Sequence, residues 1–259
     1  MPIHTNDDIG FAPDIDSASD NYAKRFSGVA GEWLLKKQQT LTQQHLLALN
    51  AKRVLDVGGG HAQNVEPIEA LNIPLTVSGS DAICQNRVLE LSHSQQTDFM
   101  LGDLDNLPTA DQSYPIVISY RIVSHMLDWR GFIDELTRVS SDAVIIDFAA
   151  KRSINWFSEL AYKLKRGKEG DTRRFNVLAQ ADVNAAFANN GFSLIKRSPQ
   201  FFFPMAIHRA LKNPKLSNLL EVLAYYLGLN ALFGSPIIST YQRQSATPDT
   251  RQDAQEGKR

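Results

Sequence analysis

The stretch RVLDVGGGHAQNVEPIEALNIPLTVSGSDA, residues 53–82, decides the fold of this chain. An apolar run ends in three glycines, Gly58, Gly59 and Gly60, and a second apolar run ends at Asp81. Glycine at a strand end lets a bound group rest on bare backbone, because no Cβ blocks its approach. A carboxylate one βα unit later can accept hydrogen bonds from a ribose diol. The stretch therefore predicts a ligand site at the carboxyl ends of two parallel strands.

Strand and helix patterns alternate on both sides of this stretch. Apolar runs of strand length lie at residues 53–58, 75–81, 98–103, 114–120, 143–149, 192–203 and 235–243. Helical periodicity covers residues 21–50, 64–72, 82–93, 129–140, 153–167, 177–189 and 205–232. Strands that are apolar on both faces and are separated by helices predict an α/β fold with a parallel sheet covered on both sides.

The 259 residues are enough for one α/β domain with additions. We expect a flexible N-terminus over residues 1–20, one domain over 21–243 and a disordered tail over 244–259. Two segments break the α/β rhythm, 150–175 and 204–233, and we predict that they are insertions that cap an acceptor site.

Composition excludes several classes of protein. Cys84 is the only cysteine, which excludes an intrachain disulfide and a cysteine-rich zinc site and fits a reducing, cytoplasmic setting. The 27 basic and 28 acidic residues leave no excess of positive charge for nucleic acid. Glu221 and Pro236 interrupt the longest apolar stretch, so we expect no transmembrane segment, although peripheral contact with a membrane stays compatible with the sequence.

Two nucleotide ligands suit a glycine turn followed by an acid. A dinucleotide site requires G-x-G-x-x-G, and Gly58 and Gly60 fit, but Gln63 occupies the third glycine position. Asp56 precedes the turn, where a carboxylate disfavours a pyrophosphate and favours a cation. An adenosyl group with an amino-acid tail fits better than a nicotinamide dinucleotide. A glycine turn without a ligand is the ordinary alternative.

Several motifs together resemble the class I S-adenosylmethionine-dependent methyltransferases that act on small molecules. LDVGGGHA (55–62) resembles the first motif of that family, and VSGSDA (77–82) resembles the second, whose acid binds the ribose hydroxyls. GDLDNLP (102–108) is similar to the third, whose aspartate meets the adenine amine. The resemblance implies a Rossmann-like sheet of seven mostly parallel strands with helices on both faces, an antiparallel last strand, and S-adenosylmethionine as the cofactor.

The resemblance also assigns residues to the cofactor site. They are Asp56, Gly58, Gly59, Gly60, Asp81, Ala82, Asp103, Leu104 and Tyr120. The helix that precedes the first strand is free to fold over the cofactor, where Tyr22, Arg25 and Phe26 would cover it. Two positions depart from the family pattern: Ala62 stands where a third glycine is common, and Pro115 stands where many members have an aspartate.

Methyl transfer from a sulfonium needs a general base only if the acceptor must lose a proton. His125, Tyr120 and Asp147 lie near strand ends, and we take His125 as the candidate catalytic residue. A hydrogen-bonded structural histidine is the more ordinary interpretation of His125. Cys84 falls on a predicted helix away from the strand ends, so thiolate attack on a cytosine ring is not expected.

The sequence thus predicts methyl transfer to a small, hydrophobic or lipid-like acceptor. Aromatic side chains in and near the two insertions favour an apolar acceptor, and no Asp/Asn-Pro-Pro-Tyr motif points to a base amine in DNA. We expect no metal and no nucleic-acid partner. The competing hypotheses are a non-catalytic S-adenosylmethionine-binding partner or regulatory protein, and a nicotinamide-dependent oxidoreductase.

Overall fold

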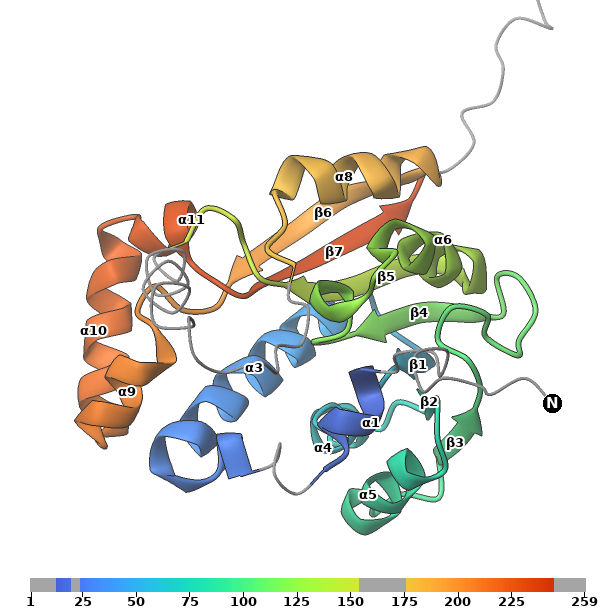
Figure 1. Ribbon diagram of the computed structural model, residues 1–259, viewed down its shortest axis with the longest axis horizontal. Coiled ribbons are helices and arrows are strands. Elements are labelled where there is room, and N and C mark those ends of the chain that lie inside the picture. Colours follow the sequence, from blue (N-terminus) through green and yellow to red (C-terminus); the bar gives the residue numbers. More distant parts are fainter. Residues whose placement is uncertain (1–12, 20–23, 154–175, 245–259) are drawn as a thin grey trace, which may run out of the picture.

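Seven strands form a single sheet with the order β3-β2-β1-β4-β5-β7-β6 (Figure 1). The computed structural model describes residues 13–19, 24–153 and 176–244. The strands are β1 (Val54–Val57), β2 (Leu75–Gly79), β3 (Thr97–Leu101), β4 (Tyr114–Ser119), β5 (Ser140–Phe148), β6 (Phe192–Pro199) and β7 (Ile237–Arg243). The first five strands pair in parallel, and β7 is antiparallel to both β5 and β6. The predicted Rossmann-like sheet with an antiparallel last strand is confirmed.

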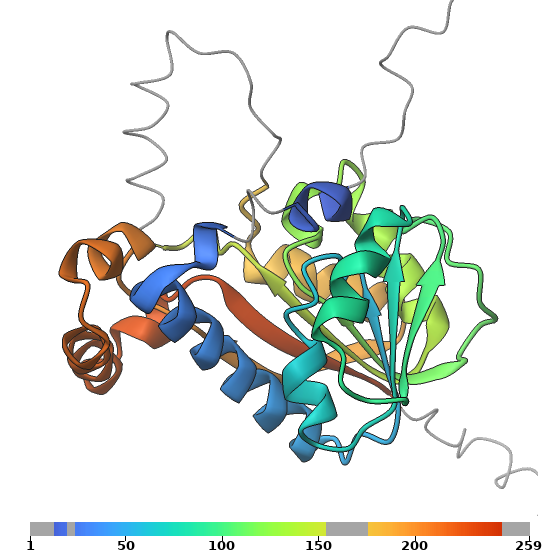
Figure 2. The ribbon, with the colours of Figure 1, turned by 90° about the horizontal axis from the view of Figure 1, so that it is seen from below.

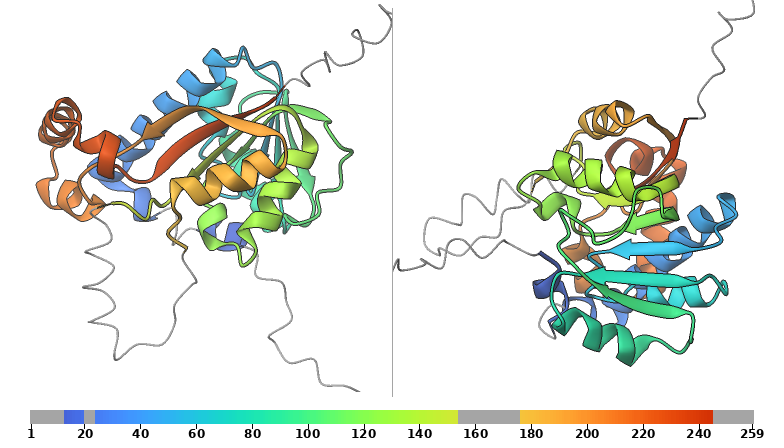
Figure 3. Two further views of the ribbon diagram at one scale, coloured as in Figure 1. Left: turned by 90° about the horizontal axis from the view of Figure 1, so that it is seen from above. Right: turned by 90° about the vertical axis from the view of Figure 1, so that its right-hand side faces the viewer.

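Helices cover both faces of the sheet. They are α1 (Pro13–Ser17), η1 (Lys24–Phe26), α3 (Gly28–Ala48), α4 (Val65–Glu69), α5 (Ile83–Leu91), η2 (Val123–His125), α6 (Trp129–Val139), α8 (Gln180–Asn189), α9 (Met205–Leu211), α10 (Pro214–Tyr226) and α11 (Leu229–Phe233). The left view of Figure 3 shows α6 and α8 on one face and α3 on the other. Helices are needed on both faces because neighbouring residues of a strand point to opposite faces. Val54 and Leu55 of β1 are both fully buried, each in a separate core.

The last helical segment differs from the single helix predicted over 205–232. Lys212 adopts a left-handed conformation with φ 48°, and the side chain of Asn213 accepts hydrogen bonds from the first amides of α10. Pro214 then occupies the first turn of α10, where its missing N–H is not needed. Gly228, with φ 72°, separates α10 from α11. The insertion is therefore three helices with sharp turns between them.

Glu221 on α10 ties this insertion together. Its carboxylate accepts hydrogen bonds from the amides of Phe202 and Phe203 at 2.9 and 3.0 Å and from Asn230 at 3.1 Å, and it lies 3.0 Å from Nε2 of His208. Trp33 of α3 packs against His208, with ring centroids 4.9 Å apart. The three helices are thereby fixed to each other and to α3.

The structure describes only part of two predicted segments, 1–20 and 150–175. Residues 13–17 form α1 within the stretch that we predicted to be flexible, because Asp14 there makes hydrogen bonds to the sheet edge. The insertion predicted over 150–175 lies outside the described residues from 154 onward. Among the helices that the structure describes, none combines the length and apolar character that crossing a membrane requires.

Candidate functional site

The glycine turn follows β1 at the carboxyl edge of the sheet. The amides of Gly58 and Gly59 both donate to the carbonyl of Ser78, which fixes the turn on β2. Gly58 has φ +74°, and a Cβ there would lie 2.5 Å from Cγ1 of Ile122. Glycine is therefore required at this position by packing as well as by backbone conformation. Ala62 has φ +55°, a left-handed conformation that explains why a glycine is common at this place in the motif.

Two buried carboxyl groups lie at the same edge. Burial raises the pKa of Asp56 to about 7, the side-chain hydrogen bond from Asn64 opposes this shift, and the charge of Asp147 adds to it. Burial likewise raises the pKa of Asp147 to about 6, against the hydrogen bond that it accepts from the amide of Arg121. Nδ2 of Asn64 lies 3.1 Å from both oxygens of Asp56. A cation bound beside these groups would favour their ionised form.

Asp81 lies two residues after the end of β2 and is exposed to solvent. One of its oxygens accepts a hydrogen bond from the amide of Ile83 at 2.8 Å, which fixes the side chain at the start of α5. Ala82 is the N-cap residue of that helix. An exposed, oriented carboxylate suits recognition of a vicinal diol, so this geometry fits the role predicted for Asp81.

Asp103 and Leu104 lie in the loop after β3. A carboxylate oxygen of Asp103 accepts a hydrogen bond from the amide of Asp105 at 3.0 Å, and the Asp103 side chain is exposed. Leu104 is buried, and its Cδ1 lies 3.6 Å from the position that a Cβ on Gly58 would take. The third motif therefore lies directly beside the glycine turn.

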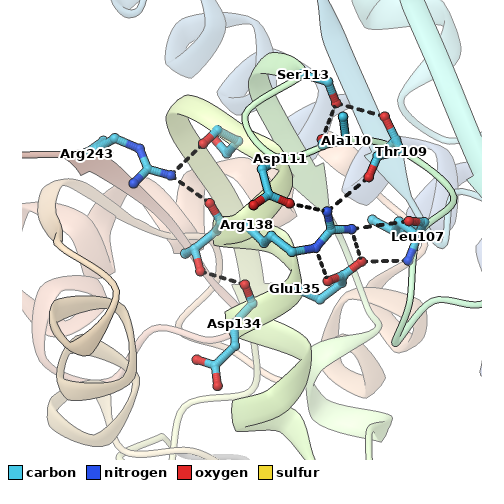
Figure 4. A network of polar contacts seen from close by, with 11 residues as sticks. Leu107, Thr109, Ala110, Asp111, Ser113, Asp134, Glu135, Arg138 and Arg243 are labelled. Carbon is cyan, nitrogen blue, oxygen red and sulfur yellow. Dashed lines mark hydrogen bonds and ion pairs between the residues drawn. The ribbon is translucent and has the colours of Figure 1, made fainter.

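A polar network on α6 holds this loop in place (Figure 4). Oε1 of Glu135 accepts a hydrogen bond from the amide of Leu107 at 2.6 Å. Arg138 donates to the carbonyls of Leu107 and Thr109 and forms an ion pair with Asp111 at 2.7 Å. The loop that carries Asp103 is thus anchored to a helix packed on the sheet.

The residues that follow β4 contact α3 and the segment before it. The hydroxyl of Tyr120 accepts a hydrogen bond from Thr42 of α3 at 3.1 Å, and burial raises the pKa of Tyr120 above its usual range. Arg121 has φ 64° and donates to Gln38 of α3 at 2.8 Å. Its guanidinium lies 4.0 Å from the ring centroid of Phe26. Arg121 and Gln38 thus contact each other at this edge of the sheet, and the sequence analysis did not name either of them.

The segment before α3 reaches the glycine turn through Phe26. Its ring centroid lies 5.6 Å from that of His61, which belongs to the turn. Arg25 is on η1, but the structure does not describe its side chain, and Tyr22 lies outside the described residues. The predicted cover over the cofactor by Tyr22 and Arg25 therefore stays a prediction.

His125 ends η2 at the same edge and is half-buried. The neighbouring Ser124 accepts a hydrogen bond from the amide of Ala149 through its hydroxyl, at 3.1 Å, and one from the amide of Asn176 through its carbonyl, at 2.6 Å. His125 therefore follows a residue, Ser124, whose hydrogen bonds reach Ala149 and Asn176. A catalytic role for His125 stays a prediction.

Asp14 of α1 is a further residue that the sequence analysis missed. It is fully buried, and its carboxylate accepts hydrogen bonds from the amide and hydroxyl of Ser80 at 2.7 and 2.6 Å. Its carbonyl lies 2.7 Å from the position that a Cβ on Gly60 would take. Helix α1 therefore packs over the glycine turn and over Cys84, whose thiol is buried.

Comparisons with known proteins agree with this geometry. A family described as "Methyltransferase domain" matches residues 55–145. A ubiquinone biosynthesis O-methyltransferase of Azorhizobium caulinodans is 22% identical over 62% of this chain, and the match spans 66% of that relative.

Solved structures share the fold. Magnesium protoporphyrin IX methyltransferase (ChlM) from Synechocystis PCC 6803 with bound S-adenosylhomocysteine aligns with a TM-score of 0.61 and 17% identity, over 86% of this chain and 94% of that one. The [4+2]-cyclase SpnF aligns with a TM-score of 0.51 and 17% identity, over 76% of each chain. The motifs, the sheet order and the family match lead to one conclusion: residues 55–145 form a methyltransferase domain, on a sheet with the fold of S-adenosylmethionine-dependent methyltransferases.

Proposed function

We propose that this protein transfers the methyl group of S-adenosylmethionine to a small, hydrophobic acceptor. One observation carries the proposal. The turn at residues 58–60, the carboxylate of Asp81 and the loop of Asp103 and Leu104 follow three adjacent strands, β1, β2 and β3, at one edge of the sheet. This is the edge at which ligands bind in parallel α/β sheets.

In the proposed reaction each of these residues binds a different part of the cofactor. Asp81 would accept hydrogen bonds from the ribose hydroxyls, and Asp103 with the backbone of Leu104 would bind the adenine. Asp56 is suited to the positively charged amino-acid end, because an adjacent cation favours its ionised form. The bound cofactor supplies an already activated methyl group, so alignment and exclusion of water are what the chain must provide.

The relatives support the class of acceptor. The curated relative is named for O-methyl transfer in ubiquinone biosynthesis, and a structural neighbour is named for methylation of magnesium protoporphyrin IX. We infer a small, hydrophobic or lipid-like acceptor from these names and from the aromatic residues of the insertion. If the methylated atom is a hydroxyl oxygen, a base must remove its proton, and His125 is the candidate for this role.

The second candidate function is binding of S-adenosylmethionine without transfer of its methyl group. One of the similar solved structures is named as a cyclase, so this fold also occurs in a protein named for chemistry other than methyl transfer. This observation supports the alternative. The two functions differ in turnover but not in cofactor binding.

The experiment has two parts. Calorimetric titration with S-adenosylmethionine and with NAD tests the cofactor, and radiolabelled-methyl cofactor with extract fractions and quinol-type phenols tests transfer. His125→Asn should lower turnover by roughly 10²–10⁴-fold if His125 is the general base. His93→Asn, on the surface after α5, is the matched control and should leave turnover unchanged. Tight binding without transfer to any acceptor would support the second function instead.

A further inference from the structure

Helix α10 buries two polar residues and exposes most of its large apolar residues. The residues that face the protein are Ser217, Glu221 and Ala224, all buried. Those on the opposite side include Leu219, Leu223 and Tyr226, which are 62%, 56% and 81% exposed. Both sets follow the spacing of one helix face, i, i+4 and i+7. An exposed apolar stripe of this length is unusual on a surface helix, whose apolar side normally faces the core.

The orientation of α10 is fixed by its buried side. Glu221 accepts hydrogen bonds from two backbone amides and from Asn230, and it contacts His208. Rotating the helix to bury its leucines would expose these donors and leave them without their partner, at a cost of several hydrogen bonds. The apolar side must therefore stay outside in this fold.

The apolar area extends beyond one stripe. Further exposed apolar side chains on α10, α11 and the turn between them are Leu216, Val222, Tyr225, Leu227 and Leu232. Figures 1 and 2 both place α9 and α10 at one end of the molecule, beyond the edge of the sheet. The sheet therefore lies to one side of these helices. We name Lys215, Leu219, Val222, Leu223 and Tyr226 the α10 outer face.

The exposed charges of segment 205–233 have one sign. Arg209, Lys212 and Lys215 are exposed, and the single acidic residue of this segment is Glu221, which is buried. Lys215 shares a helix face with Leu219, since the two are four residues apart. The exposed charge that the segment itself brings to this apolar surface is therefore entirely positive.

We propose that the α10 outer face docks on the surface of an anionic lipid bilayer. An amphipathic helix binds in the interface when apolar and aromatic side chains enter the headgroup region and cations meet anionic lipids. Tyrosines prefer this interfacial depth, which suits Tyr225 and Tyr226. The proposal rests on the surface of α10 and does not depend on the methyl acceptor.

A second copy of the chain fits this surface less well. A two-fold interface brings the same patch of both copies together, so Lys212 and Lys215 of one copy would face the same cations of the other. Like charges at such an interface oppose association, whereas an anionic bilayer attracts all of them.

The test is flotation of the full chain with vesicles of phosphatidylcholine alone and of phosphatidylcholine mixed equally with phosphatidylglycerol. We expect binding to the anionic vesicles that weakens with added salt. The double variant Leu219→Ser/Tyr226→Ser should bind at least roughly tenfold more weakly. Lys212→Glu/Lys215→Glu should lose roughly 25-fold or more on anionic vesicles, from about 1 kcal/mol per cation removed.

The matched control is Leu89→Ser on α5, which removes an equally exposed leucine from another surface and should bind as the unchanged chain does. Melting temperatures of all variants should stay near that of the unchanged chain, because the substituted side chains are exposed. The proposal is overturned if neither vesicle binds the chain, or if Leu89→Ser weakens binding as much as the α10 variants. It is also overturned if light scattering finds a dimer that Leu219→Ser/Tyr226→Ser converts to a monomer.

Discussion

At the scale of single residues, Asp56 links the stability of the protein to pH. Its pKa is about 7 in the folded chain, above the value of about 4 for an unfolded aspartate. The folded state therefore binds a proton more tightly. The contribution of Asp56 to stability should be greatest below pH 4 and should fall as pH rises to about 7, by roughly 1.4 kcal/mol for each unit of pKa difference.

Asp56→Asn should remove this part of the pH dependence. Urea unfolding at pH 5 and pH 8 measures it, and we expect the variant to lose less stability between the two values than the unchanged chain. Asp98→Asn, an exposed aspartate on β3, serves as the control and should keep the original difference. An identical pH dependence in the Asp56→Asn chain would mean that Asp56 is ionised across this range in the folded state.

The charge of Asp81 can be separated from the hydrogen bond that its side chain accepts from the amide of Ile83. Asp81→Asn retains an oxygen for the amide of Ile83, whereas Asp81→Ala removes it. If the carboxylate binds the ribose diol, both variants should lose about 5- to 150-fold in cofactor affinity, from hydrogen bonds worth about 1–3 kcal/mol. Only Asp81→Ala should also lose about 1 kcal/mol of stability. Calorimetric titration with S-adenosylhomocysteine gives the affinities, and full affinity in both variants would exclude Asp81 from the site.

At the scale of an element, α1 protects the single thiol of the chain. Burial and the charge of Asp14 raise the pKa of Cys84 to about 12, and its sulfur lies 3.6 Å from the Asp14 carboxylate. Asp14→Ala removes the hydrogen bonds that hold α1 on Ser80 and should raise the rate of thiol modification at least about tenfold. Asp111→Ala, which breaks an ion pair on α6, should not change the rate. Equal rates in all three chains would show that α1 does not control access to Cys84.

The sequence predicted the elements better than it predicted the contacts between them. Strands that are buried on both faces carry continuous apolar runs, so β1 and its neighbours were predicted within a few residues. The turn at Asn213 and Pro214 was missed because apolar periodicity continues across it, although a cap residue followed by proline is a local signal. The burial of Asp14 depends on Ser80, 66 residues later, and such a contact leaves no local pattern in one sequence.

The same difference applies to the candidate site, where features local in the sequence were predictable and long-range contacts were not. The glycine turn and Asp81 follow strand ends directly, so their place was predictable from the strands alone. Arg121 and Gln38 meet across 83 residues, and neither belongs to a motif that a single sequence reveals. The packing of Gly58 against Ile122 likewise comes from the folded sheet, where β1 and β4 are neighbours.

At the scale of the whole molecule, the helices α9, α10 and α11 should open without unfolding of the sheet. They are joined to each other through Glu221. They are joined to the rest through Trp33, through the hydrogen bond that Arg197 of β6 donates to the carbonyl of Ala231, and through the chain on either side. Glu221→Ala leaves buried donors without an acceptor and should destabilise this unit by about 3–5 kcal/mol. Glu221→Gln, which keeps the shape and one oxygen, should lose less.

Hydrogen exchange distinguishes a local opening from a global one. In Glu221→Ala we expect faster exchange of the amides of α9–α11, and unchanged exchange in β1 and β4, whose protection reflects the central core. Leu219→Ser is the control on the same helix, and it should change stability by no more than about 0.5 kcal/mol because its side chain is exposed. If exchange instead accelerates equally in β1 and α10, the insertion and the sheet unfold as one cooperative unit, and Glu221 stabilises the entire domain.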